Sequence, residues 1–133
     1  MTQQSANIIE FDPVIYPTKL WVLFSIDDLK EFTDYDGDDF KINEKSDTVD
    51  IFMLSHVKKK ISDTYGIAIV VLDELNINAI SHEAVHAASA MFDYLGISMG
   101  FDYGKDEHYA YLVGWAAECI EMANLENKKT KTK

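Results

Sequence analysis

Apolar residues recur at helical spacing in the third quarter of the chain. No proline or glycine occurs between Ile77 and Gly96. Within this stretch the apolar residues fall three or four positions apart, at Ile80, Ala84, Ala87, Ala88, Met91, Phe92 and Leu95. Asn76 or Asn78 suits the N-cap, and Gly96 suits the residue at which the chain leaves the helix. The pattern predicts a helix over residues 77–95.

A second helical pattern covers residues 105–125. Its apolar residues lie almost all round the helix: Tyr109, Tyr111, Leu112, Val113, Trp115, Ala116, Ala117, Ile120 and Met122. Such a helix is central to a core or is covered by a partner subunit, so a homo-oligomer formed through it is one alternative. Residues 127–133 are mostly lysine and threonine, and we expect a disordered tail there.

Shorter apolar runs in the first half predict strands. Residues 8–16, interrupted by Pro13, and residues 18–24 are typical of two short strands that form an edge pair. Ser25 is typical of the start of a short helix that ends at about Phe32. The β-branched run over residues 67–72 predicts a buried strand that leads by a short loop into the helix over residues 77–95.

Residues 50–65 also show helical spacing. Ile51, Leu54, Val57 and Ile61 are three or four positions apart, with Asp50 before them and Gly66 after them. We expect a helix that begins at Asp50, exposes the lysine run at residues 58–60 and ends before Gly66. His56 lies in this stretch, and a surface or packing role is expected for it.

Composition narrows the range of functions. The chain has 133 residues and a net charge of −11, which argues against a nucleic-acid surface. The first residues lack the features of a signal peptide, and apolar runs such as residues 20–24 and 67–72 are far too short to span a bilayer. Cys119 is the only cysteine, so no internal disulfide is expected. We expect a cytoplasmic protein that binds neither nucleic acid nor membrane.

The acidic loop at residues 34–39 resembles a calcium loop only superficially. An EF-hand needs glycine at its sixth position and glutamate at its twelfth. Here Gly37 is fourth and Lys45 is twelfth. A solvated acidic turn is therefore expected.

The chemistry of the chain centres on His82-Glu83-Ala84-Val85-His86, an H-E-x-x-H pattern. Residues four apart share a helix face, so the two imidazoles can converge on one metal ion. Glu83, beside the first histidine, can direct its carboxylate at a water on that ion. The pattern is typical of half of a zinc hydrolase site.

Catalytic zinc usually takes three protein ligands and leaves one position for water. The first turn of the second helix holds Asp106, Glu107 and His108. Glu107 is our choice for the third ligand, with Asp106 or His108 as substitutes, and Asp93 is a weaker option. The small residues Ala110 and Gly114 would let the two helices approach closely.

These residues resemble a known family. A strand, an H-E-x-x-H helix, a loop and an acidic residue on the next helix are similar to the gluzincin-type zincins. The likeness is greatest to small prophage and mobile-element members, and it extends more distantly to ImmA/IrrE-like metallopeptidases. The resemblance covers residues 67–119 and implies that zinc is bound by His82, His86 and Glu107, with Glu83 as general base.

The match to this family is incomplete. Larger gluzincins carry N-E-x-x-x-D at the third ligand, whereas Asp106 and Tyr111 occupy the outer positions here. In those gluzincins the aspartate holds a zinc-binding histidine in place, so the supporting contacts around the ligands differ here. Tyr103, His108 and Tyr109 are candidates for stabilising the oxyanion of the reaction.

We therefore expect an α+β fold, with a small mixed sheet packed on about three main helices. The H-E-x-x-H helix and the long helix after it are expected to hold the metal between them. Residues 1–126 should form a single zincin-like domain. The predicted function is zinc-dependent hydrolysis of a peptide bond in a peptide or protein substrate. The alternatives are a zinc-binding, non-catalytic zincin-fold interaction protein and a metal-free helical domain with an accidental motif.

Overall fold

The computed structural model describes residues 8–40, 51–97 and 106–131 of the chain. Residues 1–74 and 75–133 form two compact units. The first unit contains a mixed sheet and the second contains two long helices, so the α+β class is confirmed. The expectation of a single domain over residues 1–126 stays a prediction.

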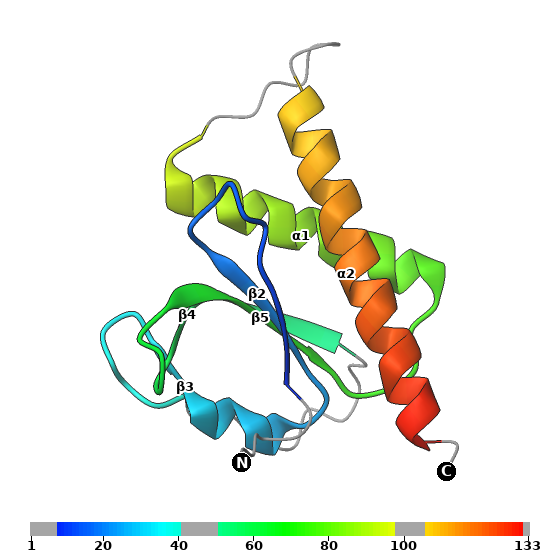
Figure 1. The fold of residues 1–133 in the computed structure, drawn as a ribbon, viewed down its shortest axis with the longest axis horizontal. Coiled ribbons are helices and arrows are strands. Elements are labelled where there is room, and N and C mark those ends of the chain that lie inside the picture. Colours follow the sequence, from blue (N-terminus) through cyan, green and yellow to red (C-terminus); the bar gives the residue numbers. More distant parts are fainter. Residues whose placement is uncertain (1–7, 41–50, 98–105, 132–133) are drawn as a thin grey trace. The chain divides into compact units, whose positions relative to one another are not determined.

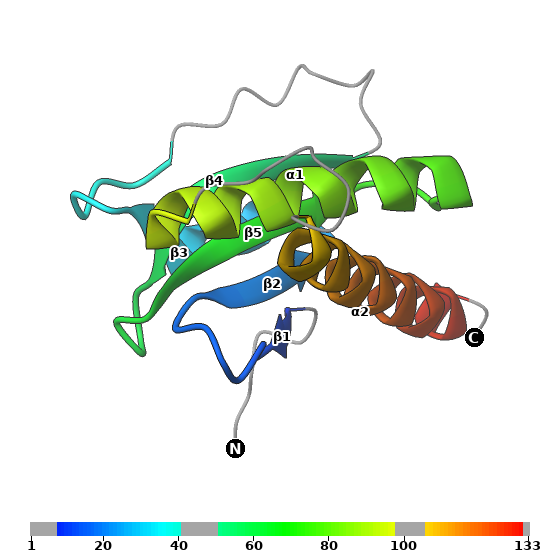
Figure 2. The same ribbon diagram turned by 90° about the horizontal axis from the view of Figure 1, so that it is seen from above.

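The first unit contains a five-stranded sheet (Figure 1). Its elements are β1 (Ile9–Phe11), β2 (Lys19–Leu23), the 3-10 helix η1 (Ile26–Glu31), β3 (Phe32–Asp34), β4 (Ile51–Lys59) and β5 (Tyr65–Val71). The strand order is β1-β2-β5-β4-β3. Only β2 and β5 run parallel, and the other pairs are antiparallel. Figure 2 shows β2, β5 and β4 as neighbouring strands.

Several local features of this unit match their predictions. β1 and β2 form the expected edge pair and run antiparallel, but β1 covers only part of the predicted residues 8–16. The short helix begins at Ser25, whose hydroxyl accepts a hydrogen bond from the Asp27 amide, but it is a 3-10 helix. The acidic loop is a tight turn in which one Asp34 carboxylate oxygen accepts from the amides of Asp36 and Asp38.

The predicted helix over residues 50–65 is wrong, because residues 51–59 form the strand β4. β4 pairs with β5 along most of its length, and the register shifts between Leu54 and Val57. Val57 is buried in the core of this unit, and Phe52 and Leu54 pack against the same core. The irregularity turns the ordinary two-residue step of a strand into a three-residue step, which imitates helical spacing. Asp50, the expected N-cap, lies outside the described residues.

The lysine run belongs to the hairpin between β4 and β5 rather than to a helix end. The Lys58 ammonium lies 3.0 Å from an Asp63 carboxylate oxygen, and the Lys60 ammonium lies 3.0 Å from one of Asp39. The Asp63 and Asp39 side chains are 78% and 76% exposed, so water screens both pairs and each contributes little to stability. Asp63 and Asp39 neutralise part of the positive charge of this lysine run.

A cluster of buried side chains forms the core of the first unit: Trp21, Leu23, Leu29, Phe32, Val57, Ala68 and Val70. The Trp21 ring meets the Phe32 ring edge to face at a centroid distance of 5.1 Å. Its indole nitrogen donates to a Glu10 carboxylate oxygen 2.9 Å away, so the polar end of this buried side chain is satisfied.

The second unit contains α1 (Ile77–Leu95) and α2 (Glu107–Lys131). The bounds predicted for the first helix are confirmed. Asn76 is the N-cap, accepting a 2.8 Å hydrogen bond from the Ala79 amide, and Gly96 ends the helix at φ 72°. α2 continues to Lys131, so the predicted disordered tail is helical over residues 127–131.

α2 crosses α1 and packs against it (Figure 1). Its apolar residues are not uniformly buried: Leu112, Ala116, Cys119, Ile120 and Ala123 are buried on one stripe, whereas Tyr111, Met122 and Leu125 are exposed. The expected close approach at Ala110 and Gly114 is wrong. Both are exposed, and a Cβ added at Gly114 would meet no described atom within 4 Å. None of the helices that the structure describes is long and apolar enough to cross a bilayer.

Asn124, in the second half of α2, bonds to Leu75, which lies two residues before the start of α1. Its side-chain oxygen accepts from the Leu75 amide, and its side-chain nitrogen donates to the Leu75 carbonyl, both at 3.4 Å. Asn124 is only 3% exposed and Leu75 is also buried. Asn124→Ala would leave two buried backbone groups without this partner. We expect it to lower the free energy of unfolding by about 1–3 kcal/mol.

Urea denaturation of the whole chain measures this loss, with Glu121→Ala, at an exposed position of the same helix, as the control. A midpoint for Asn124→Ala equal to that of the control would show that the amide pair contributes nothing.

Candidate metal centre

His82 and His86 come together on α1 at a spacing that suits one metal ion. Their Nε2 atoms are 3.2 Å apart, and the ring centroids are 4.8 Å apart. Two nitrogen ligands of a tetrahedral zinc ion, each at about 2.0–2.1 Å, lie roughly 3.3 Å apart. Both imidazoles are exposed, with 64% of the His82 side chain accessible. The pair therefore fits two of the positions around zinc.

Glu83 lies beside this pair but on the buried side of α1. The residue is 9% exposed, and its carboxylate comes within 4.0 Å of the His82 Nε2 atom. A carboxylate at this distance is too far for a hydrogen bond and close enough for a bridging water. Glu83 is thus placed next to the candidate site, where it could exchange a proton with a water.

Among the described residues, none is brought to the histidine pair as a third ligand. Asp106, Glu107 and His108 are exposed at the start of α2, and Asp93 is exposed on α1. In the part of the chain that the structure describes, no three His, Cys, Asp or Glu side chains form a group that could hold a metal. The choice of Glu107, with its alternatives, therefore stays a prediction.

Tyr109 makes specific contacts with α1. Its hydroxyl lies 2.9 Å from the Ser89 hydroxyl and donates to the Val85 carbonyl oxygen at 3.3 Å. Its ring meets the Phe92 ring at a centroid distance of 5.7 Å. The hydroxyl thus bonds to α1, while its role with an oxyanion, like that of His108, stays a prediction. Tyr103, the third candidate, lies outside the described residues.

Ser89 is a residue of this region that the sequence alone did not single out. It follows His82 by seven positions and His86 by three, so all three lie on one stripe of α1. That spacing was visible in the sequence, but a serine on a helix surface has no distinguishing feature until its partner is known.

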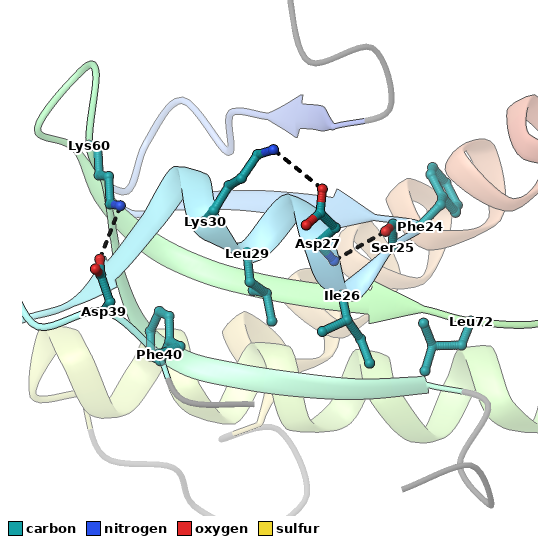
Figure 3. Close-up of a pocket in the computed structure, with 10 residues that line it drawn as sticks. All are labelled: Phe24, Ser25, Ile26, Asp27, Leu29, Lys30, Asp39, Phe40, Lys60 and Leu72. Atoms are coloured by element: carbon teal, nitrogen blue, oxygen red, sulfur yellow. Dashed lines mark hydrogen bonds and ion pairs between the residues drawn. The ribbon is translucent and has the colours of Figure 1, made fainter. Parts of the chain in front are cut away.

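The first unit contains a separate open cavity of about 690 Å³. Ile26, Leu29, Phe40 and Leu72 supply apolar lining (Figure 3). Two exposed ion pairs border it, Lys30 with Asp27 at 3.3 Å and Lys60 with Asp39 at 3.0 Å. None of the predicted site residues lines this cavity. Its lining comes from four separate stretches of sequence, so no motif could have indicated it.

Cys119 belongs to the core and not to a reactive site. It is buried in α2, and burial, aided by the nearby Glu118 carboxylate, raises the pKa of its thiol to about 12. At pH 8 the thiol is therefore protonated, and the thiolate is the reactive form. We expect Cys119 to resist Ellman's reagent at pH 8 in the folded protein and to react fully in urea. Rapid reaction without denaturant would contradict this placement.

Comparisons of the chain with protein-family models, with curated proteins and with solved structures found no match. Any statement about function therefore rests on the geometry of the histidine pair and on the H-E-x-x-H motif.

Proposed function

We propose that this chain is a zinc-dependent metallopeptidase whose metal is held by His82, His86 and Glu107. The observation that supports the proposal is the 3.2 Å separation of the two Nε2 atoms, which suits two ligands of one zinc ion. The surroundings of the pair agree with this, because a carboxylate lies beside it and the imidazoles are accessible. The resemblance of the motif to gluzincin-type zincins supplies the reaction type.

The protein groups have separate roles in this proposal. Bound zinc would supply a Lewis acid and lower the pKa of a water molecule towards about 7. His82 and His86 would hold it, and Glu107 would add a negative ligand from the first turn of α2. Glu83 accepts the proton of the attacking water and passes it to the leaving amine as the peptide bond breaks. The substrate is a peptide or a protein.

A second candidate is a zinc-binding protein that performs no hydrolysis. One observation favours it: Glu83, the proposed general base, is only 9% exposed. In this alternative the zinc would serve an interaction with a partner protein.

The first test of both candidates is metal content. The protein would be purified without added metal or a metal-binding tag and analysed by mass spectrometry. We expect about one zinc per chain in the wild type and at least a tenfold lower content in His86→Ala, because that variant lacks a direct ligand.

His56→Ala provides the matched control, since His56 is an exposed histidine on β4. It should keep the wild-type zinc content. If the wild type holds no zinc even after incubation with the ion, the zinc proposal is wrong in both forms.

A further inference from the structure

Tyr109 contacts α1 beside the stripe formed by His82, His86 and Ser89, which is called the histidine stripe below. The contacts involve Val85, Ser89 and Phe92, which are spaced four and three residues apart and so follow the helix axis. Val85 precedes His86 directly, and Ser89 lies on the same stripe as both histidines. The Tyr109 hydroxyl therefore binds α1 within one turn of His86.

Tyr109 also belongs to the first turn of α2. The Ala110 amide donates to the Asp106 carbonyl at 2.8 Å, so helical hydrogen bonding already spans residues 106–110. Glu107 and His108 are therefore part of the same rigid turn as Tyr109. Where the tyrosine side chain is fixed on α1, the backbone of these two residues is fixed as well.

We propose that Tyr109 is a positioning residue for the metal centre. Its hydrogen bonds to Ser89 and to the Val85 carbonyl hold the first turn of α2 at the histidine stripe, so that a side chain from this turn can complete the zinc site. The inference rests on the proposed zinc site and adds a second group of residues on which metal affinity depends. Tyr109 acts by fixing the backbone of Glu107 and His108 against α1, and it does not itself bind the ion.

Tyr109→Phe tests this inference because it removes the hydroxyl and keeps the ring that contacts Phe92. Zinc affinity of the full chain would be measured by competition with a chromogenic chelator. We expect about a tenfold weaker affinity, the lower end of what loss of a supporting contact usually costs. Tyr111→Phe is the matched control, since Tyr111 is 71% exposed on the same helix, and it should bind zinc as the wild type does.

Two further measurements separate positioning from a general loss of structure. The visible spectrum of the cobalt-substituted protein should change in Tyr109→Phe and not in Tyr111→Phe, because it reports the ligands around the metal. Ser89→Ala should weaken zinc binding as Tyr109→Phe does, and the double variant should be no weaker than either single one.

Wild-type affinity and an unaltered cobalt spectrum in Tyr109→Phe would overturn the inference and leave the zinc site standing. Additive losses in the double variant would also overturn it, because the two hydroxyls would then act separately. A wild type that binds no zinc would overturn the inference together with the proposed function.

Discussion

Gly66→Ala should lower the free energy of unfolding by about 3 kcal/mol or more, the upper part of the range for overpacked core positions. Gly66 lies in β5 opposite Lys19 of β2, where the two strands run parallel. A Cβ at this position would lie 2.2 Å from the Lys19 carbonyl oxygen and 2.7 Å from the Trp21 ring. The carbonyl belongs to the backbone of the neighbouring strand, so relief of the contact requires β2 and β5 to separate.

Gly114→Ala is the matched control, with the opposite sign. Gly114 is exposed within α2, and a Cβ there would meet no described atom within 4 Å. Alanine in the interior of a helix is favoured over glycine by about 0.5–1 kcal/mol, so this variant should be the more stable protein. Urea denaturation of both variants measures the two changes. Equal stability of Gly66→Ala and the wild type would contradict the pairing of β2 with β5.

Gly66 also shows why part of the fold could not be predicted from the sequence. The same residue suited the end of a helix over residues 50–65, because the apolar residues before it were three or four positions apart. In the structure the step from Leu54 to Val57 arises from the irregularity in β4, whereas Ile61 lies beyond the strand and is 86% exposed. The partner strand that imposes the irregularity is β5, and a local pattern contains no information on pairing. The strand expected over residues 67–72, which is β5, was predictable because its apolar run is regular. The helix after it was predictable because its apolar spacing is regular and its caps, Asn76 and Gly96, lie next to it in the sequence.

The candidate site also has one part that the sequence predicted and one part that it did not. The approach of His82 to His86 follows from helix geometry alone, and the sequence was sufficient to predict it. The contact between Tyr109 and Ser89 depends on how α2 crosses α1, which the spacing of small residues did not indicate. Ala110 and Gly114 are exposed, and the described contact is made by a tyrosine. Sequence therefore predicted the part of the site that lies within one helix.

Glu83→Gln should reduce peptide hydrolysis at least a hundredfold while zinc content stays at about one ion per chain. The amide has nearly the shape of the carboxylate but cannot accept the proton of the attacking water, and general base catalysis commonly contributes 10²–10⁴-fold. Glu83 lies 4.0 Å from the His82 Nε2 atom and does not need to bind the metal itself. Hydrolysis would be followed with fluorescently labelled casein, and zinc content by mass spectrometry of the same samples.

Glu118→Gln is the control for this test, because Glu118 is an exposed glutamate on α2 and should keep full activity. Retained hydrolysis in Glu83→Gln would exclude Glu83 as the base, since no proton could be taken by the amide. A wild type that binds zinc and hydrolyses neither casein nor a mixed peptide library would instead favour the non-catalytic candidate.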